Sequence, residues 1–285
     1  MEPGEEFDYN ITAVSGHVGN TGAITRSGAS SHIKVKECGS YPTEYENYCK
    51  AWQSFPWHVP EPLERYFMNG REVIVIRGVP HRPVSMGSIA ADRHGLVRKI
   101  IGLLDASSTG ARMAAPVEPH RAFLHPVQKR TTDPTCAAIV EDWIETERPD
   151  ALPHIWQHGD FVINNLGLTD PGLVVFDWEE FGRTAFPGLD LCTLLAFDAA
   201  FNADTSWAIV RGARHGKHRY AELPEDGCPV IGLAPELFRQ FIQIYPVIFL
   251  DLKREYGKSN EMVVNQLVHD LPGQATGKPC AGSRS

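Results

Sequence analysis

The chain has 285 residues, of which 42% are hydrophobic and 22% charged, and these values exclude a largely disordered protein. Its formal net charge of −8 disfavours nucleic-acid binding as the main role, because such chains usually carry a basic excess. The six cysteines form no C-x-x-C pair, and no apolar run approaches the ~20 residues of a membrane span. The acidic start lacks the apolar core of a signal peptide, so we expect a cytoplasmic protein without a membrane partner.

The first part of the chain is expected to be rich in β-strands, with one helix. Alternating or β-branched residues predict strands, and apolar residues on one side predict a helix that Thr43 caps. Composition rich in Gly, Ser and Thr predicts a loop or a loose hairpin. In chain order, the predicted elements are strand 10–14, loop or hairpin 15–31, strand 32–36, helix 43–55 and strand 72–76.

The remainder is expected to be mainly helical around one hairpin. The turn at Asp170-Pro171-Gly172 separates the two arms of that hairpin. Residues 107–134 are rich in Gly, Pro, Ser and Thr and predict an irregular segment. The other predicted elements are helix 96–104, helix 135–147, hairpin arms 154–168 and 173–178, helices 190–200 and 235–245, and a frayed tail from residue 271.

The hairpin carries a group of residues suited to one kind of chemistry. It contains H-G-D-x-x-x-x-N, and its second arm ends near Asp177. Phosphoryl transfer from ATP needs a carboxylate that takes the proton of the acceptor hydroxyl, and a second carboxylate and an amide that hold Mg²⁺. Asp160 and Asn165 share one loop and Asp177 follows on the next strand, so the three can meet. A zinc site at His154 and His158 is disfavoured, because the segment is not helical and lacks a third ligand.

This segment resembles the aminoglycoside phosphotransferase family, the small-molecule branch of the protein-kinase-like fold. The resemblance is strong over residues 154–196 and weak elsewhere. It implies an α+β, bilobal protein-kinase-like fold with a small β-rich N-lobe and a larger, mainly helical C-lobe. The motifs that carry it are His158-Gly159-Asp160, Asn165, Asp177-Trp178-Glu179, Gly182-Arg183, Pro187 and Asp190-Leu191.

The resemblance also implies domain boundaries and residue roles. We expect a nucleotide-binding lobe over 1–82 with a hinge near 77–83, a catalytic and substrate lobe over 83–270, and a disordered tail over 271–285. Spacing favours Asn165 over its neighbour Asn164, and Glu179 receives no chemical role. The implied roles are catalytic base for Asp160, Mg²⁺ ligands for Asn165 and Asp177, and structural support for His158 and Asp190.

A kinase-like nucleotide lobe also needs a strand lysine that is paired with a helix glutamate, and a glycine-rich loop over the phosphates. Flanking apolar residues favour Lys34, while Lys36 stays open. Glu44 borders the apolar side of its helix, whereas Glu46 has Lys50 four residues on, as solvent-side pairs do. The favoured set for nucleotide binding is Lys34, Glu44, Gly16 and Gly19.

The predicted function is ATP- and Mg²⁺-dependent transfer of the γ-phosphate to a hydroxyl of a small molecule, an antibiotic or a metabolite. The sequence favours neither ATP nor GTP as the phosphate donor. The alternative is a kinase-like nucleotide-binding module without turnover. A protein kinase is the weakest hypothesis, because H-R-D, D-F-G and a long activation segment are missing. Residues 191–285 hold ten acidic and ten basic residues, so no acidic surplus indicates a polycationic acceptor.

Overall fold

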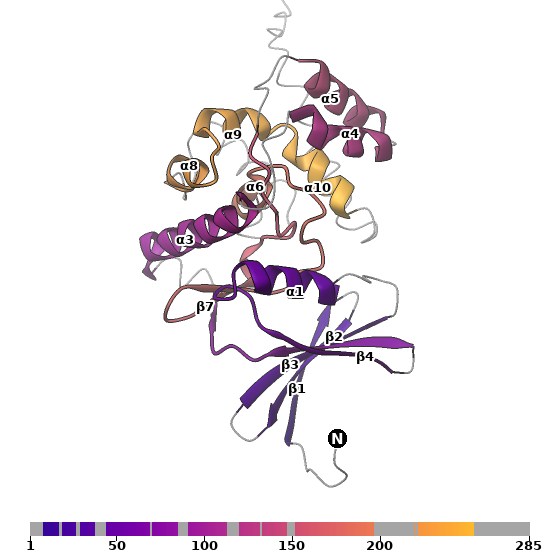
Figure 1. The fold of residues 1–285 in the computed structure, drawn as a ribbon, viewed down its shortest axis with the longest axis vertical. Coiled ribbons are helices and arrows are strands. Elements are labelled where there is room, and N and C mark those ends of the chain that lie inside the picture. The colour runs from indigo at the N-terminus through magenta and orange to yellow at the C-terminus, as the bar shows by residue number, and fades with distance from the viewer. Residues whose placement is uncertain are drawn as a thin grey trace, which may run out of the picture. The chain divides into compact units, whose positions relative to one another are not determined.

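The structure is a computed structural model (Figure 1). Its chain divides into two compact units. Unit 1 comprises Met1–Ala115 and Ile155–Thr184, and unit 2 comprises Pro116–His154 and Ala185–Ser285. None of the described helices is long and apolar enough to cross a membrane. The structure describes residues 8–16, 19–26, 29–37, 44–68, 70–84, 91–112, 120–131, 133–146, 152–196, 220 and 222–253, with the side chains of 8–37, 68, 109–112, 250 and 253 outside the description.

Unit 1 begins with an antiparallel five-stranded sheet of order β1-β2-β3-β5-β4. The strands predicted at 10–14, 32–36 and 72–76 are confirmed. For 15–31 the hairpin alternative is correct and the loop is wrong, because the strands pair through Gly16↔Gly19 and Arg26↔Ala29. Strand β4 was not predicted from the sequence. The strands are β1 (Asp8–Gly16), β2 (Gly19–Arg26), β3 (Ala29–Glu37), β4 (Pro62–Met68) and β5 (Arg71–Arg77).

Helix α1 (Glu44–Ser54) lies against this sheet (Figure 1). Its predicted position at 43–55 is confirmed, although the expected cap Thr43 lies outside the described residues. Arg65 of β4 joins helix to sheet, since it forms ion pairs with Glu46 of α1 and, at 2.7 Å, with the buried Glu72 of β5. One arginine therefore fixes the helix to two strands.

The rest of unit 1 contains a long helix and a small sheet. The predicted hairpin is confirmed, and its turn is closed by bonds of 3.1 Å between Thr169 and Gly172. His58 extends this hairpin, because its carbonyl accepts the Val175 amide at 2.8 Å and its Nδ1 lies 2.8 Å from the Leu173 carbonyl. These elements are α3 (Arg93–Arg112), β6 (Arg82–Pro83), η1 (Ile163–Asn165), β7 (Leu166–Leu168) and β8 (Leu173–Val175), with sheet order β6-β7-β8.

Unit 2 is helical in its described part. The prediction that 107–134 is irregular is wrong at both ends of the segment. Helix α3 of unit 1 continues to Arg112, and α4 of unit 2 forms despite Pro126 in its interior. The predicted helix at 235–245 is interrupted by a turn at 242–244. The described elements are α4 (His120–Arg130), α5 (Pro134–Glu145), α6 (Leu189–Ala196), η2 (Leu223–Gly227), α8 (Cys228–Val230), α9 (Pro235–Phe241) and α10 (Tyr245–Lys253).

Tyr245 is at the centre of the aromatic core of unit 2. Its ring packs on Phe186 and Phe238, and its buried hydroxyl donates to the Pro187 carbonyl at 2.9 Å. Gly188 passes so close that an added Cβ would lie 2.5 Å from this hydroxyl, and its φ is +85°. Both observations explain glycine at that position, since only glycine adopts a positive φ without steric cost.

The predicted division into lobes at residue 82 and the hinge near 77–83 stay predictions. The predicted tail over 271–285 lies outside the described residues.

Candidate active site

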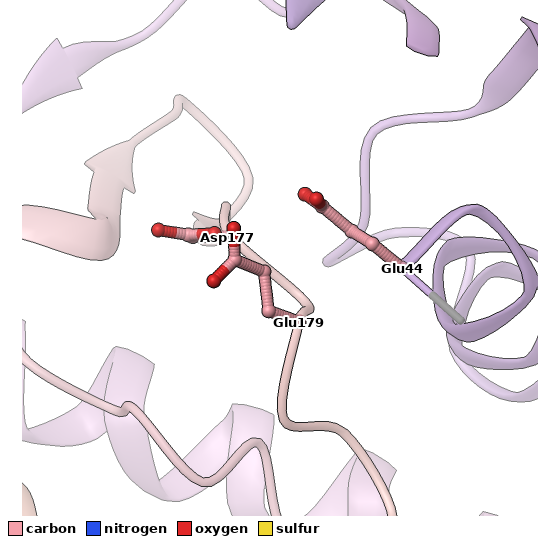
Figure 2. Close-up of side chains that lie close together, drawn as sticks. All are labelled: Glu44, Asp177 and Glu179. Carbon is pink, nitrogen blue, oxygen red and sulfur yellow. The ribbon is translucent and has the colours of Figure 1, made fainter. Parts of the chain in front are cut away.

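Helix α1 and the turn after β8 bring three carboxylates together in unit 1. One oxygen from each of Glu44, Asp177 and Glu179 lies within 4.8 Å of the others, and Figure 2 shows the three side chains. Glu44 is fully buried and Glu179 is 8% exposed. Magnesium prefers oxygen ligands, and this donor set consists of carboxylates alone. Within the part of the chain that the structure describes, the group therefore suits a hard divalent cation.

Asp177 has an unusual backbone conformation. Its φ is +65°, and among the described residues it is the only one other than glycine with a positive φ. This conformation is unfavourable for residues with a side chain, although Asp and Asn tolerate it better than most. The Asp177 amide donates to the Tyr48 hydroxyl at 3.0 Å. The direction of the carboxylate therefore depends on a backbone geometry that a side chain of α1 stabilises.

Asp160 is hydrogen-bonded to Asn165 within the loop 158–165. The Asn165 Nδ2 donates to the Asp160 carbonyl at 2.9 Å and lies 3.4 Å from the Asp160 Oδ2. Because a carbonyl only accepts, the amide nitrogen must face Asp160, and the amide oxygen is then the atom with which Asn165 can bind a cation. The Phe176 amide donates to the Asn165 carbonyl at 2.9 Å, which ties this loop to the residue before Asp177.

His158 connects the same two segments. The Asp160 amide donates to its Nδ1 at 3.2 Å, and its Nε2 lies 2.9 Å from the Phe176 carbonyl. An amide can only donate and a carbonyl can only accept, so these bonds require the neutral tautomer with a proton on Nε2. The ring packs against Trp178, with the centroids 4.7 Å apart. The supporting role expected for His158 stays a prediction, and these contacts are the ones it would use.

Gly159 lets the loop pass close to the segment after Asp177. Its φ is +87°, and an added Cβ would lie 2.6 Å from the Cβ of Glu180. Glu180 is buried and forms an ion pair of 2.9 Å with Arg183. The glycine between His158 and Asp160 is therefore required both by conformation and by space.

The predicted site residues fall into three groups. Asp160, Asn165 and His158 are joined by hydrogen bonds, and Asp177 lies with Glu44. Lys34 and Lys36 lie opposite Ile74 and Glu72 in β3–β5, and Gly16 and Gly19 pair across the β1–β2 hairpin, so their nucleotide-binding roles stay predictions. Asp190 is buried in the first turn of α6, in unit 2, and its bracing role also stays a prediction.

Sequence reasoning missed three contributors to the site. The sequence assigns no chemical role to Glu179, places Tyr48 only on the apolar side of its helix, and does not single out Asn47, whose Nδ2 donates to the Trp178 and Glu179 carbonyls. A signal for Asn47 and Tyr48 was present, because they follow Glu44 by three and four residues and so share its side of the helix. The competing Glu46 is instead paired with Arg65.

Comparison with known proteins identifies the family. The sequence profile of the phosphotransferase enzyme family matches residues 61–224, more than half of the chain. The chain therefore belongs to this family, the phosphotransferases that include the aminoglycoside kinases, and the resemblance found at 154–196 is confirmed. No curated protein matches the sequence.

Solved structures of aminoglycoside phosphotransferases share the fold. A protein assigned as an aminoglycoside phosphotransferase from Ralstonia eutropha JMP134 has 15% identity and a TM-score of 0.64, over 95% of this chain and 94% of that one. A thermostable mutant of APH(4)-Ia, in a complex with ADP and hygromycin B, has 13% identity and a TM-score of 0.60, over 95% and 94%. APH(2″)-IIIa, with GDP and kanamycin, has 9% identity and a TM-score of 0.57, over 94% and 92%. At these identities the likeness concerns the fold alone, and it confirms the predicted α+β protein-kinase-like class.

Proposed function

We propose that this protein is an ATP- and Mg²⁺-dependent phosphotransferase that transfers the γ-phosphate to a hydroxyl of a small molecule. The observation that carries the proposal is the bonded pair of Asp160 and Asn165, in the same compact unit as the carboxylates of Glu44, Asp177 and Glu179. Family membership supports phosphoryl transfer as the class of reaction. ATP dependence favours the cytoplasm as the compartment.

Asp160 is the proposed base. Its carboxylate is held beside the Asn165 amide nitrogen, which fixes the direction of one oxygen. The carboxylate would accept a hydrogen bond from the acceptor hydroxyl, orient its oxygen towards the γ-phosphate and take its proton as the new bond forms. His158 holds the Asp160 amide, so the main chain of the base is fixed as well.

Asp177 and Asn165 are the proposed ligands of Mg²⁺, and the carboxylate donor set around Asp177 suits that ion. A Mg²⁺ ion held by these two residues would supply positive charge that neutralises the phosphates of the nucleotide. Lys34, with Glu44 as its partner, would hold the α- and β-phosphates, and the backbone amides near Gly16 and Gly19 would cover them.

The acceptor is proposed only as a class, a small hydroxylated molecule. Two structural relatives form complexes with hygromycin B and with kanamycin, so aminoglycosides belong in a first screen. The balance of ten acidic and ten basic residues over 191–285 gives no preference for a polycation. Neutral hydroxylated antibiotics and metabolites therefore belong in the same screen.

The test combines an ATP-consumption screen with calorimetry of Mg-ATP binding. Asp160→Asn keeps the shape of the side chain and removes its basicity, so turnover should fall about 10²–10⁴-fold, while Mg-ATP binding stays measurable. Asp177→Asn tolerates the same backbone conformation and should weaken nucleotide binding only when metal is present. Absence of Mg-ATP binding by wild type at millimolar nucleotide would refute the proposal. Binding without turnover of any acceptor would favour the nucleotide-binding module instead.

A further inference from the structure

Two neighbouring residues of α1 hold the main chain of the turn that carries Asp177 and Glu179. The Asn47 Nδ2 donates to the carbonyls of Trp178 and Glu179, at 3.0 Å each. The Tyr48 hydroxyl accepts the Asp177 amide, also at 3.0 Å. Both side chains are 3% exposed. Three consecutive residues of the turn are thus bonded to one short stretch of helix.

These bonds act on the residues that supply carboxylates. Asp177 has a φ of +65°, which a residue with a side chain adopts only when its surroundings stabilise it. Asn47 and Tyr48 supply partners for the amide at the start of this turn and for the carbonyls that follow it. Without them, the turn loses the contacts that favour its left-handed residue, and the carboxylate of Asp177 loses its fixed direction.

The same helix supplies the third carboxylate. Glu44 precedes Asn47 by three residues and Tyr48 by four, so all three lie on one side of α1. The helix therefore both delivers Glu44 and fixes the backbone that presents Asp177 and Glu179. On another side, Arg65 connects α1 to the sheet through Glu46 and Glu72.

We propose that Asn47 and Tyr48 are positioning residues for the divalent cation, so that cation affinity depends on the contact between α1 and the turn 177–179. They act through Asp177 and Glu179 and need not touch the ion. This inference rests on the proposed function, because it assumes that Asp177 is a ligand of the metal in a metal–nucleotide complex.

The first test compares Tyr48→Phe with Tyr45→Phe in the full chain. Both changes remove one tyrosine hydroxyl from α1, but Tyr45 lies by the Arg65 guanidinium, 5.9 Å from its ring centre, and has no part in the turn. ATP affinity is measured by calorimetry in EDTA and at a series of free Mn²⁺ concentrations. We expect Tyr48→Phe to reduce the enhancement by Mn²⁺ about tenfold, or about 1.4 kcal/mol. Its metal-free ATP affinity, and both affinities of Tyr45→Phe, should stay within about twofold of wild type.

A second measurement does not depend on nucleotide. Amide hydrogen exchange of a peptide that covers residues 176–179 should become faster in Tyr48→Phe and in Asn47→Asp, because the turn loses its partners, and should be unchanged in Tyr45→Phe. Asn47→Asp keeps the shape but replaces the donating nitrogen with an oxygen that faces two carbonyls, so it should reproduce the loss of Mn²⁺ enhancement.

Three outcomes would overturn the inference. If Tyr48→Phe weakens ATP binding equally with and without Mn²⁺, Tyr48 supports the fold and not the cation. If it matches Tyr45→Phe in both assays, the bond to Asp177 has no effect on the metal. If wild-type ATP affinity does not respond to Mn²⁺ at all, the proposed function fails and the inference fails with it. The titration of wild type alone separates this outcome from a failure of the inference only.

Discussion

Gly159→Ala tests the packing of the loop 158–165 against the segment after Asp177. The substitution adds one methyl group at a residue with a φ of +87°, where the new Cβ would lie 2.6 Å from the Cβ of Glu180. Carbon atoms in contact normally lie about 3.5–4.0 Å apart. One of the two backbones must therefore move by about 1 Å.

The expected cost has two parts. The positive φ costs about 1–2 kcal/mol for a residue with a side chain. The steric overlap adds about 1–3 kcal/mol, as overpacking of a buried site usually does. Asp160 follows Gly159 directly, so the same movement displaces the proposed base, and a shift of about 1 Å at a reacting group can lower turnover about 100-fold.

Gly182→Ala is the matched control for this prediction. Gly182 lies in the same unit and has a φ of +74°, but a Cβ there would meet no atom within 4 Å. The control therefore includes the conformational cost without the overlap. Urea unfolding of both variants should show the larger loss of free energy for Gly159→Ala, by about 1–3 kcal/mol. Equal losses would refute the argument, because the contact with Glu180 would then contribute nothing.

Two further predictions concern pH and the core of unit 2. Burial lowers the pKa of His58 below its ordinary 6.5, against a smaller opposing effect of its bond to the Leu173 carbonyl. The unfolded chain then binds the proton more readily, so stability should fall as pH drops below about 6.5. His58→Gln should flatten this slope in urea unfolding between pH 7.5 and 5, and an unchanged slope would exclude His58 as its source. Gly188→Ala should lower the free energy of unfolding by about 3 kcal/mol. Adding Tyr245→Phe to that variant should restore part of the loss, because it removes the oxygen that would lie 2.5 Å from the new Cβ. Strictly additive effects in a double-mutant cycle would contradict this contact.

The hairpin and the loop 158–165 could be predicted because the residues that define them are close in sequence. Asp160 and Asn165 are five residues apart, and a hairpin brings back Asp177, so spacing alone placed them on neighbouring segments. The roles of Asn47 and Tyr48 could not be assigned in this way, because their partners lie about 130 residues further along the chain. Long-range contacts of this kind leave only a weak trace in a single sequence, here the helical spacing from Glu44.

Helix α4 shows a different limit. The Gly, Pro, Ser and Thr residues of 107–134 indicated an irregular segment, and the helix even contains Pro126. The helix nevertheless buries His120, Leu124 and Val127. The last two follow His120 by four and seven residues, so all three lie on one side of the helix. The His120 Nε2 also lies 2.9 Å from the Trp143 carbonyl of α5. Tertiary packing of this side outweighs the low helix propensity of the composition.

Unit 1 is discontinuous in sequence, and this affects how the protein is made. Residues 1–115 leave the ribosome before Ile155–Thr184, which complete the same unit. Asn47 precedes the carbonyls that it bonds by 131 and 132 residues, an interval on the order of 10 s at about 5–20 residues per second. During that time the nascent α1 carries polar side chains destined for burial, without their partners. The order of synthesis thus sets the earliest moment at which the three carboxylates of Glu44, Asp177 and Glu179 can come together. A chain that stops before residue 177 never brings them together.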